Sequence, residues 1–505
     1  MLQKTRLFLA TLVFILVTGL FLDFTGTLHR WLGWLAQVQF LPAILALNVG
    51  IIAFLIVLTL IFGRIYCSII CPLGILQDLI SWVSGKRKKK KYRFSYSPAK
   101  SWLRYSILVI FIAAIVLGIG SIVALLAPYS SYGRIAQNLL SPVYIAGNDL
   151  LAYLAERANS YAFYSQEVWI RSLPTFIIAT ATFVILIILA WRNGRTYCNT
   201  ICPVGTTLGF LARFSWFKIR IDDSKCNQCG LCSKGCKSAC IDSKSHTVDY
   251  SRCVVCGNCV ETCHKHAIKY GIHSVASTKT NADESIAENP QKEKTTDKAR
   301  RSFLIGATIA TASAATAQEK KKVDGGLAAI EEKTAPKRNT PLTPPGSVSA
   351  QNMAHHCTAC QLCVAECPNG VLRPSTDIMK LMQPVMSYER GYCRPECTQC
   401  SSVCPTGAIK PIQQEDKSSI QIGHAVWIKK NCIPVADGVE CGNCARHCPV
   451  GAITMVNSLP GDDSSPKIPA INTARCIGCG ACENLCPARP FSAIYVEGHE
   501  VHRVI

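Results

Sequence analysis

Cysteine is the residue type whose number and spacing in this sequence point to chemistry. The chain of 505 residues contains 29 cysteines, and twenty-four of them fall into six groups of four that each end in C-x2-C-x3-C. A disulfide framework has no reason to repeat one spacing, whereas an iron–sulfur cube needs four thiolates arranged in this way. The spacing therefore predicts about six [4Fe-4S] clusters, and with them the capacity for one-electron transfer.

The first two groups lie close together in the chain and match the paired pattern of bacterial ferredoxins. In that pattern, three cysteines of one run and the fourth of the other hold each cluster. Zinc is the main alternative, but a zinc ion takes four ligands and gives no reason for tandem runs. The predicted ligands are Cys226, Cys229, Cys232, Cys236, Cys253, Cys256, Cys259 and Cys263.

This pair of groups departs from the ferredoxin pattern in two ways. Lys237 and His264 follow the fourth cysteines, where ferredoxins usually have proline. An additional thiol, Cys240, lies four residues after Cys236, so either of the two is a candidate ligand. The thiol that binds no iron is expected to be a buried free cysteine.

Four more groups occupy the last third of the chain, and each of them is followed by proline. Their members are Cys357, Cys360, Cys363, Cys367, Cys393, Cys397, Cys400, Cys404, Cys432, Cys441, Cys444, Cys448, Cys476, Cys479, Cys482 and Cys486. The spacing does not determine which groups exchange their fourth cysteine. Secondary structure should be sparse there, because clusters replace much of the hydrophobic core. Gly407 and Gly451 suit the turns that lead from two of the motifs into short strands.

The elements that must position these groups differ between the two ends of the chain. The first two hundred residues are strongly apolar and contain four stretches, 7–24, 41–62, 105–127 and 173–191, that are near the length of a helical membrane span. We therefore predict an α-helical membrane bundle of four spans over residues 1–215, followed by small α+β ferredoxin-like iron–sulfur modules.

Charges beside the predicted spans indicate their orientation. The connection between the second and third spans holds ten basic residues and one acid, Asp78, whereas the loop between the third and fourth holds three of each sign. By the positive-inside rule, both chain ends of the bundle are then cytoplasmic. The first span is expected to be retained, because no small-residue cleavage site follows it.

An internal repeat connects the bundle with the same chemistry. The string GRIYCSIICPLG at residues 63–74 recurs as GRTYCNTICPVG at residues 194–205. Each copy follows an even-numbered span, so both C-x3-C-P pairs are expected at the cytoplasmic face, where their thiols would converge. Three roles are open for these candidate redox thiols: a shared metal or cluster site, a dithiol/disulfide pair, or packing. The thiols are those of Cys67, Cys71, Cys198 and Cys202.

Haem and nucleic acid do not fit the sequence. The predicted bundle has one histidine, His29, which is expected to be a solvated loop residue, and no C-x-x-C-H string occurs. The net charge of +21 falls to roughly +9 once six clusters of about −2 each are bound, and much of the remainder lies beside the spans. We therefore expect membrane lipid, the quinone pool and redox proteins as partners, and no nucleic acid.

Residues 273–350 are predicted to be a linker between a two-cluster module at 216–272 and a four-cluster domain at 351–505. The first part of the linker is rich in Lys, Glu, Thr and Ser and nearly free of large apolar residues. Arg300 and Arg301 then precede a weakly apolar run that closes with Ala315 and Ala317, which is typical of a twin-arginine export signal. We expect the four-cluster domain to be exported folded, and the alternative is a short amphipathic or disordered connector.

Taken together, these motifs resemble two known families. The duplicated C-x3-C-P motifs on four spans and the following ferredoxin module resemble the NapH/MauN type of membrane ferredoxin protein of periplasmic nitrate reductase systems. The part after Arg300, with the long spacer between Cys432 and Cys441, resembles the periplasmic NapG/MauM type. The resemblance implies oxidation of membrane quinol on one side of a relay and reduction of a periplasmic acceptor on the other. The chain departs from it because the two parts are fused and the first module lacks its prolines.

We expect a multi-pass protein of the inner membrane, with its first ferredoxin module cytoplasmic and its C-terminal module periplasmic. It would be an electron-transfer subunit of a quinol-dehydrogenase type, because no paired carboxylates, nucleophile motif or dinucleotide fingerprint indicates other chemistry. Two other classes remain open. One is a membrane ferredoxin for the maturation or regulation of another redox enzyme, and the other is a cytoplasmic ferredoxin subunit of a dehydrogenase complex.

Overall fold

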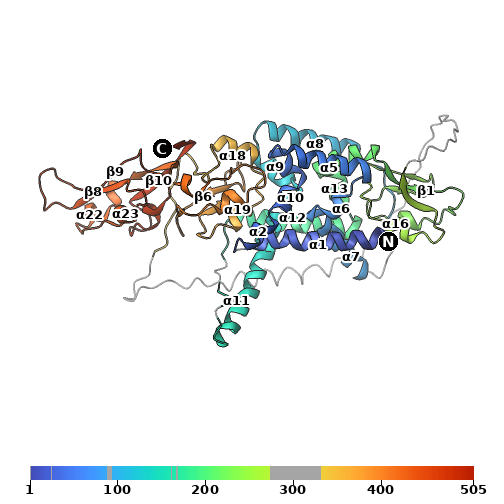
Figure 1. Cartoon of the computed structure of the whole chain (residues 1–505), viewed down its shortest axis with the longest axis horizontal. Coiled ribbons are helices and arrows are strands. Elements are labelled where there is room, and N and C mark those ends of the chain that lie inside the picture. Colours follow the sequence, from blue (N-terminus) through green and yellow to red (C-terminus); the bar gives the residue numbers. More distant parts are fainter. Residues whose placement is uncertain (1, 24, 88–93, 161, 166–168, 273–330) are drawn as a thin grey trace, which may run out of the picture. The chain divides into compact units, whose positions relative to one another are not determined.

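The computed structural model describes residues 2–23, 25–87, 94–160, 162–165, 169–272 and 331–505. The predicted export signal at 300–317 and most of the predicted linker lie outside the described residues. Residues 1–273 and 334–505 form one compact unit. This unit contains a helical bundle, a first cysteine-rich module at 217–272 and a second one at 334–505 (Figure 1).

Four helices run along the bundle: α1 (Leu2–Leu22), α5 (Val49–Phe62), α8 (Ser101–Val116) and α12 (Leu173–Asn193). Further helices connect and flank them. These are α2 (Thr27–Leu32), α3 (Trp34–Gln37), α4 (Phe40–Leu45), α6 (Tyr66–Ile69), α7 (Pro72–Arg87), α9 (Gly120–Leu126), α10 (Pro128–Ile135), the π-helix η1 (Ala136–Leu140), α11 (Ser141–Arg157), α13 (Thr196–Thr200), α14 (Pro203–Leu211) and the 3-10 helix η2 (Ala212–Phe214).

Two of the four predicted spans are continuous helices, and the other two are interrupted. Among the described residues, α1 and α12 are long and apolar enough to cross a membrane, whereas α5 and α8 have 14 and 16 residues. The stretch 41–62 is divided because the Asn48 side chain caps α5 by accepting a hydrogen bond from the N–H of Ile51. The stretch 105–127 is divided at Gly118, whose φ of 70° ends α8. The four uninterrupted spans expected from the sequence are therefore not seen.

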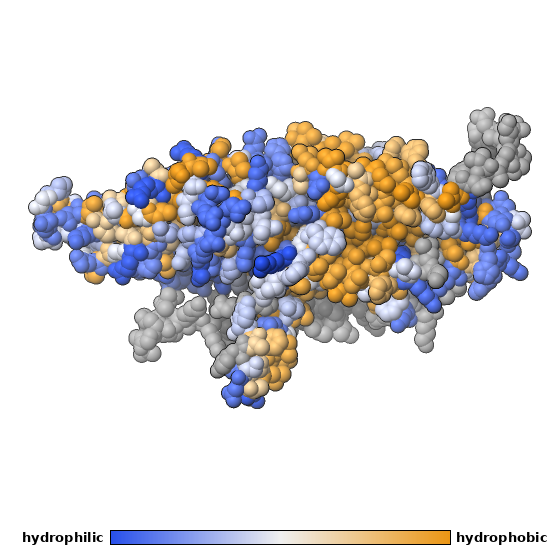
Figure 2. Space-filling model, in the orientation of Figure 1, coloured by the Kyte–Doolittle hydropathy of each residue, from blue (hydrophilic) through white to orange (hydrophobic). Residues whose placement is uncertain are grey.

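The outer surface of the bundle carries many large apolar side chains. Phe8 of α1 is 68% exposed, and Val109 of α8 is 65% exposed. Figure 2 shows apolar side chains gathered over the bundle helices and polar side chains over the cysteine-rich modules. A large exposed apolar surface marks a membrane or a protein partner, and together with α1 and α12 it favours association with a membrane.

The first module packs two short antiparallel strand pairs around its cysteines. Strand β1 (Phe217–Ile221) pairs antiparallel with β4 (Ile268–Ile272), and β2 (Ile241–Asp242) pairs with β3 (Thr247–Val248). The short helices α15 (Leu231–Lys234) and α16 (Asn258–Thr262) each follow a glycine of positive φ, Gly230 or Gly257. These turns carry the cysteine motifs of the module.

The second module has sparse secondary structure, as the sequence predicts. Its strands form three antiparallel pairs: β5 (Leu372–Pro374) with β6 (Pro384–Met386), β7 (Ile420–Trp427) with β10 (Ile494–Val504), and β8 (Ile453–Asn457) with β9 (Lys467–Ile471). Its helices are short: α18 (Ala350–His356), α19 (Leu362–Ala365), α20 (Gln399–Ser402), α21 (Gln414–Lys417), η3 (Lys429–Asn431), α22 (Ile433–Ala436), α23 (Asn443–Arg446) and α24 (Ala481–Asn484). Gly407 and Gly451 have φ of 70° and 60°, and β8 follows the second of them.

The packed part of the second module begins before the predicted boundary at residue 351. The backbone N–H of Thr334 donates to the carbonyl of Pro490 at 2.9 Å. Leu342 is buried, and its carbonyl accepts a hydrogen bond from the N–H of Met386. Residues 334–350, which their composition assigns to the linker, therefore belong to the folded module, because they help to close its core.

The two modules contact opposite ends of the bundle helices. Arg104, near the start of α8, donates to the hydroxyl of Ser251 in the first module at 3.0 Å. Ser121, beyond the end of α8, donates its N–H to the carbonyl of Met379 in the second module at 3.4 Å. Helix α12 runs in the opposite direction, because Arg171, just before its start, donates to a carbonyl of the second module.

A buried histidine makes the stability of the second module dependent on pH. His502 lies on β10, where its Nε2 is 2.9 Å from the hydroxyl of Thr343. Burial and the nearby His499 lower the pKa of His502 to about 4. The unfolded state binds the proton at an ordinary pKa of about 6.5. The contribution of His502 to the free energy of unfolding should therefore be constant above that pH. It should decrease by about 2 kcal/mol as the pH drops from about 6.5 to about 4.

Thermal denaturation of the cluster-containing protein near pH 7.5 and near pH 5.5 measures this effect. We expect a smaller acid-induced decrease in melting temperature for His502→Gln, which has no proton to gain. An equal decrease in both proteins would show that His502 does not carry the pH dependence.

Candidate metal centres

The structure brings the cysteines of the six predicted groups together as six sets of four. Each set takes three thiols from one motif and one from its neighbour, and we name it after the first cysteine of the run of three. The sets are the Cys226 tetrad (with Cys229, Cys232 and Cys263), the Cys253 tetrad (with Cys256, Cys259 and Cys236), the Cys357 tetrad (with Cys360, Cys363 and Cys404), the Cys393 tetrad (with Cys397, Cys400 and Cys367), the Cys432 tetrad (with Cys441, Cys444 and Cys486) and the Cys476 tetrad (with Cys479, Cys482 and Cys448).

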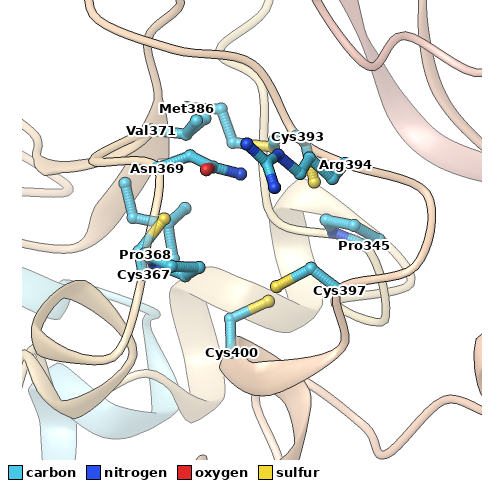
Figure 3. A pocket seen from close by; sticks show the side chains of 11 residues that line it. Pro345, Cys367, Pro368, Asn369, Val371, Met386, Cys393, Arg394, Cys397 and Cys400 are labelled. Atoms are coloured by element: carbon cyan, nitrogen blue, oxygen red, sulfur yellow. The ribbon is translucent and has the colours of Figure 1, made fainter. Parts of the chain in front are cut away.

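The exchange of the fourth cysteine, which the spacing leaves open, occurs between neighbouring motifs. All four thiols of the Cys393 tetrad line one pocket, in which the sulfur of Cys367 faces those of the other motif (Figure 3). Conversely, burial and the nearby thiols, Cys404 among them, raise the pKa of Cys363 well above its ordinary value. The Cys432 and Cys476 tetrads exchange their fourth cysteines in the same way. Reciprocal exchange of this kind is the ferredoxin arrangement.

Backbone N–H groups donate hydrogen bonds to sulfur atoms of the tetrads. The N–H of Ile409 donates to Sγ of Cys404 at 3.4 Å, and the N–H of Ala452 donates to Sγ of Cys448 at 3.2 Å. Such bonds favour the charged form of the sulfur, and they are one of the means by which a protein adjusts an iron–sulfur centre.

Buried cations without a carboxylate partner lie beside the tetrads. Arg134 is fully buried next to Cys360, and Lys417, which is 5% exposed, lies next to Cys393. In the described part of the chain, no carboxylate lies within ion-pair distance of either. Buried unpaired charge is costly, but four thiolates around a [4Fe-4S] core carry about −2 and would balance it. The donor set and its surroundings therefore fit iron–sulfur clusters.

The spacing of the thiols argues against zinc. Four thiolates on one zinc ion lie roughly 3.8 Å apart, because Zn–S bonds are about 2.3 Å long. Among the described residues, one set of three or more metal-binding side chains has all its ligand atoms within 4.8 Å of one another, and it consists of Asp23, His29 and Glu366. No set of cysteines is that compact, so the tetrads are more open than a single zinc ion requires.

The structure distinguishes the two candidate ligands at the end of the first motif. Cys236 lies near both Cys256 and Cys259. Cys240 lies 3.5 Å from the sulfur of Cys236, and its thiol lowers the pKa of Cys236 to about 6 by hydrogen bonding. Cys240 also makes a hydrogen bond with Cys253. The nearness of Cys236 to Cys256 and Cys259 favours Cys236 as the fourth ligand, with Cys240 as a buried thiol beside it.

We expect Cys240→Ala to keep all the irons of the wild-type protein, and Cys236→Ala to lose roughly four of them per chain. Iron and acid-labile sulfide analysis of anaerobically prepared protein measures both. Loss of iron in Cys240→Ala with retention in Cys236→Ala would reverse the assignment.

The four thiols of the internal repeat, here called the bundle quartet, lie buried together between the two copies. They belong to Cys67, Cys71, Cys198 and Cys202. The copies hold each other, because Arg64 donates to the carbonyl of Cys198 at 3.2 Å and Arg195 donates to the carbonyl of Cys67 at 2.5 Å. The motif Gly-Arg-x-Tyr-Cys contained the signal for these arginines, since it repeats with the arginine at the same offset.

A buried ion cluster attaches the first module to the bundle. Asp78 of α7 accepts from Arg195 at 2.7 and 2.8 Å, and it pairs with Lys237 at 2.8 Å and with Arg6 at 3.0 Å. Burial alone would raise the pKa of Asp78, but the charges of Arg195, Lys237 and Arg6 lower it far below its ordinary value. Lys237 thus has a role at the position where ferredoxins have proline. The signal in the sequence was Asp78 itself, the single acid in a basic connection.

His29 is not the solvated loop residue expected from the sequence. Its side chain is 6% exposed, and its Nδ1 lies 2.8 Å from Oε1 of Glu366, which is 1% exposed. Helix α2 places the histidine, and Glu366 directly precedes the ligand Cys367 of the second module. No local pattern could have indicated this pair, because its members are far apart in the sequence.

The tetrads follow one another in a fixed order. In the first module, the Cys226 tetrad adjoins the Cys253 tetrad. In the second module, the Cys357 tetrad adjoins the Cys393 tetrad. The N–H of Cys393 donates to the carbonyl of Cys479 at 2.9 Å, which places the Cys476 tetrad next, and the Cys432 tetrad follows it. Each module therefore holds an uninterrupted series of sites.

Three models of protein families match parts of the chain. A 4Fe-4S binding domain matches residues 44–91 and again residues 174–222, and 4Fe-4S dicluster domains match residues 249–371 and 439–489. The match at 249–371 joins one motif from each module, whereas in the structure each of these motifs takes its fourth cysteine from within its own module. No solved structure matches the chain.

Several curated proteins are similar to parts of the chain. The methylamine utilization ferredoxin-type protein MauM of Paracoccus denitrificans is 30% identical over 188 residues, which are 35% of this chain and 77% of the relative. The ferredoxin-type protein NapF of Escherichia coli K12 is 27% identical over 179 residues, 35% of this chain and 99% of the relative. The putative electron transport protein YccM of Escherichia coli K12 is 28% identical over 205 residues, 39% of this chain and 48% of the relative.

Proposed function

Because the chain belongs to the family of MauM ferredoxin-type proteins, we propose that it is a membrane-bound polyferredoxin. It is an iron–sulfur protein of ferredoxin type that transfers electrons. In this proposal it relays them through [4Fe-4S] clusters from membrane quinol to a soluble oxidoreductase on the periplasmic side. The observation that carries the proposal is that two modules with series of cysteine tetrads contact opposite ends of one apolar bundle.

The membrane part of the proposal assigns α1, α5, α8 and α12 to four spans and likens this part to the NapH/MauN type. Its support is the apolar exposed surface of these helices and their alternating direction between the two modules. Helix α7, which leads into the basic run at 86–91, is tied by Asp78 to the first module. The positive-inside rule then puts the first module in the cytoplasm and the second module in the periplasm.

The residues of the tetrads and their neighbours are suited to hold clusters that transfer one electron at a time. When bound, iron–sulfur clusters supply one-electron transfer at potentials set by charge, hydrogen bonding and exposure. The tetrads hold thiolates at fixed positions, the backbone N–H groups favour their charged form, and Arg134 and Lys417 provide compensating positive charge. Each quinol that is oxidised to quinone gives up two electrons and two protons, so two single-electron transfers follow for every quinol.

The test is anaerobic titration of the purified full chain in detergent with a quinol. We expect the visible absorbance of the oxidised clusters to bleach, and to return when an oxidant is added. Bleaching by dithionite but not by quinol would contradict the role of quinol. Protease treatment of intact spheroplasts tests the topology, because cleavage beyond residue 330 is expected only if the second module is periplasmic.

A further inference from the structure

Apart from Cys240, the cysteines that the proposed function leaves unused are those of the bundle quartet. In each copy of the repeat, a helix of four or five residues, α6 or α13, carries the first cysteine, and proline after the second cysteine starts α7 or α14. The arginine of each copy donates to the first cysteine's carbonyl in the other copy. This reciprocal arrangement turns the two C-x3-C pairs toward each other, so that Cys71 lies near both Cys198 and Cys67.

Two glycines allow the backbones to approach the thiols closely. A Cβ at Gly74 would lie 2.4 Å from the carbonyl oxygen of Cys67, and one at Gly205 would lie 2.3 Å from that of Cys198. Both positions therefore require glycine. As a result, the N–H of Gly205 reaches Sγ of Cys202 at 3.3 Å, a bond that favours thiolate.

The surroundings of the quartet supply positive charge and hydrogen-bond donors. Arg64 is fully buried, has no carboxylate partner among the described residues, and lies 3.8 Å from Sγ of Cys67. Nε2 of Gln77 donates to Sγ of Cys198 at 3.2 Å. Asp78 is a single acid against three cations. A net positive charge in a buried site is costly unless an anionic group balances it.

Neither a disulfide nor a single zinc ion meets these conditions. The four cysteines are free, and a disulfide would carry no charge to balance Arg64. The thiols are also not as compact as one zinc ion requires, because no set of three or more cysteines among the described residues has all its sulfur atoms within 4.8 Å of one another. The 4Fe-4S binding domain matches each copy separately, yet each match contains only two cysteines, which is half of a ligand set.

We propose that the bundle quartet binds one iron–sulfur cluster, shared between the two copies of the repeat, as a seventh centre. The inference rests on the proposed function, because the centre would connect the cluster series of the two modules. On one side, Arg64 contacts the first module through the carbonyl of Ser251 at 2.9 Å, beside Cys253. On the other side, the hydroxyl of Tyr197 donates to the carbonyl of Leu126 at 3.3 Å, and Arg134 lies between Tyr197 and the Cys357 tetrad. One electron would pass from the cluster of a neighbouring tetrad to the shared centre, and from there to the cluster of the next tetrad. The first cluster would be oxidised by one electron and the last reduced by one electron, and the shared centre would return to its original state.

The test counts iron and acid-labile sulfide in the anaerobically purified full chain, with EPR and Mössbauer spectra. The wild-type protein should hold about seven clusters, roughly 28 irons if all are of the [4Fe-4S] type, rather than roughly 24. Cys71→Ala and Cys202→Ala should each lose the same single centre. The double variant should lose no more than either single variant, because both thiols bind one cluster. Ser68→Ala is the matched control, because Ser68 is adjacent to Cys67 in the sequence and its hydroxyl donates to the carbonyl of Ile65 at 3.0 Å.

Three results would overturn the inference: six clusters in the wild-type protein, unchanged iron in both single variants, or losses that add up to two centres in the double variant. The wild-type count decides the question even where a variant fails to fold. Wild-type protein with six clusters that quinol reduces would remove the seventh centre and keep the proposed function. Protein without clusters, or with clusters that quinol does not reduce, would instead count against the proposed function.

Discussion

Replacing Cys404 by alanine is expected to remove the cluster whose other ligands lie in the preceding motif, at Cys357, Cys360 and Cys363. The reason is the exchange of fourth cysteines, which places Cys404 beside that run and Cys367 beside the run of Cys393. Loss of one ligand from a four-thiolate site should release roughly four irons per chain. It should also interrupt the series at the tetrad nearest to the bundle, so that the tetrads beyond it are no longer reduced by quinol.

Double variants test the exchange directly, with iron content as the measurement. Cys404→Ala combined with Cys357→Ala should lose no more iron than Cys404→Ala alone, because both residues bind one cluster. Cys404→Ala combined with Cys393→Ala should lose roughly twice as much. The reverse pattern would show that each motif holds its own cluster without exchange.

The second large effect is expected at Asp78. In Asp78→Asn, the cations Arg195, Lys237 and Arg6 lose the carboxylate that they share. Removal of one partner from a buried ion cluster typically costs about 3–5 kcal/mol, because the remaining charges stay buried without compensation. Since Lys237 belongs to the first module, the contact of that module with the bundle should weaken most. Thermal unfolding of the full chain and proteolytic release of residues 216–272 measure the loss.

The same ion cluster has a defined pH dependence. Because the cations lower the pKa of Asp78 in the folded state, its stabilising contribution is complete above the unfolded pKa of about 3.9 and is lost only as the pH falls below that value. At neutral pH, Asp78→Asn should therefore show its full effect. Asp222→Asn is a suitable control, because the side chain of Asp222 is 37% exposed, its ion pair with Lys225 lies at the surface, and asparagine keeps an oxygen for the hydrogen bonds from Ser224. Equal stability of Asp78→Asn and the wild-type protein would contradict the role of the ion cluster.

The family matches and the structure agree on the iron–sulfur chemistry, and they differ in how motifs are paired. The dicluster match at 249–371 crosses from the first module to the second, because the two motifs that it joins share the C-x2-C-x2-C-x3-C spacing. Spacing alone contains no information about which motif supplies the fourth cysteine of a tetrad. The paired strands of each module bring its neighbouring motifs together, and this local packing decides the exchange.

The iron–sulfur chemistry of this protein follows from local patterns in its amino-acid sequence. Thiolates repeated at one spacing, as at Cys226 to Cys236, prescribe a metal centre whatever the surrounding fold, because the ligands of each run are close in the chain. The apolar stretches and the repeated Gly-Arg-x-Tyr-Cys motif could also be recognised in the sequence, because both are local patterns. The interruptions at Asn48 and Gly118 were missed because a hydropathy pattern does not register a single cap or a residue of positive φ.

Contacts between residues that are far apart in the chain became known from the packing of the folded protein. It paired Cys367 with the run of Cys393, Lys237 with Asp78, and His29 with Glu366, and it brought two halves of a ligand set together in the bundle quartet. Contacts of this kind depend on how whole elements pack. A charge that is removed from water is costly until packing brings an opposite charge beside it, as Glu366 lies beside His29 and Asp78 beside Lys237.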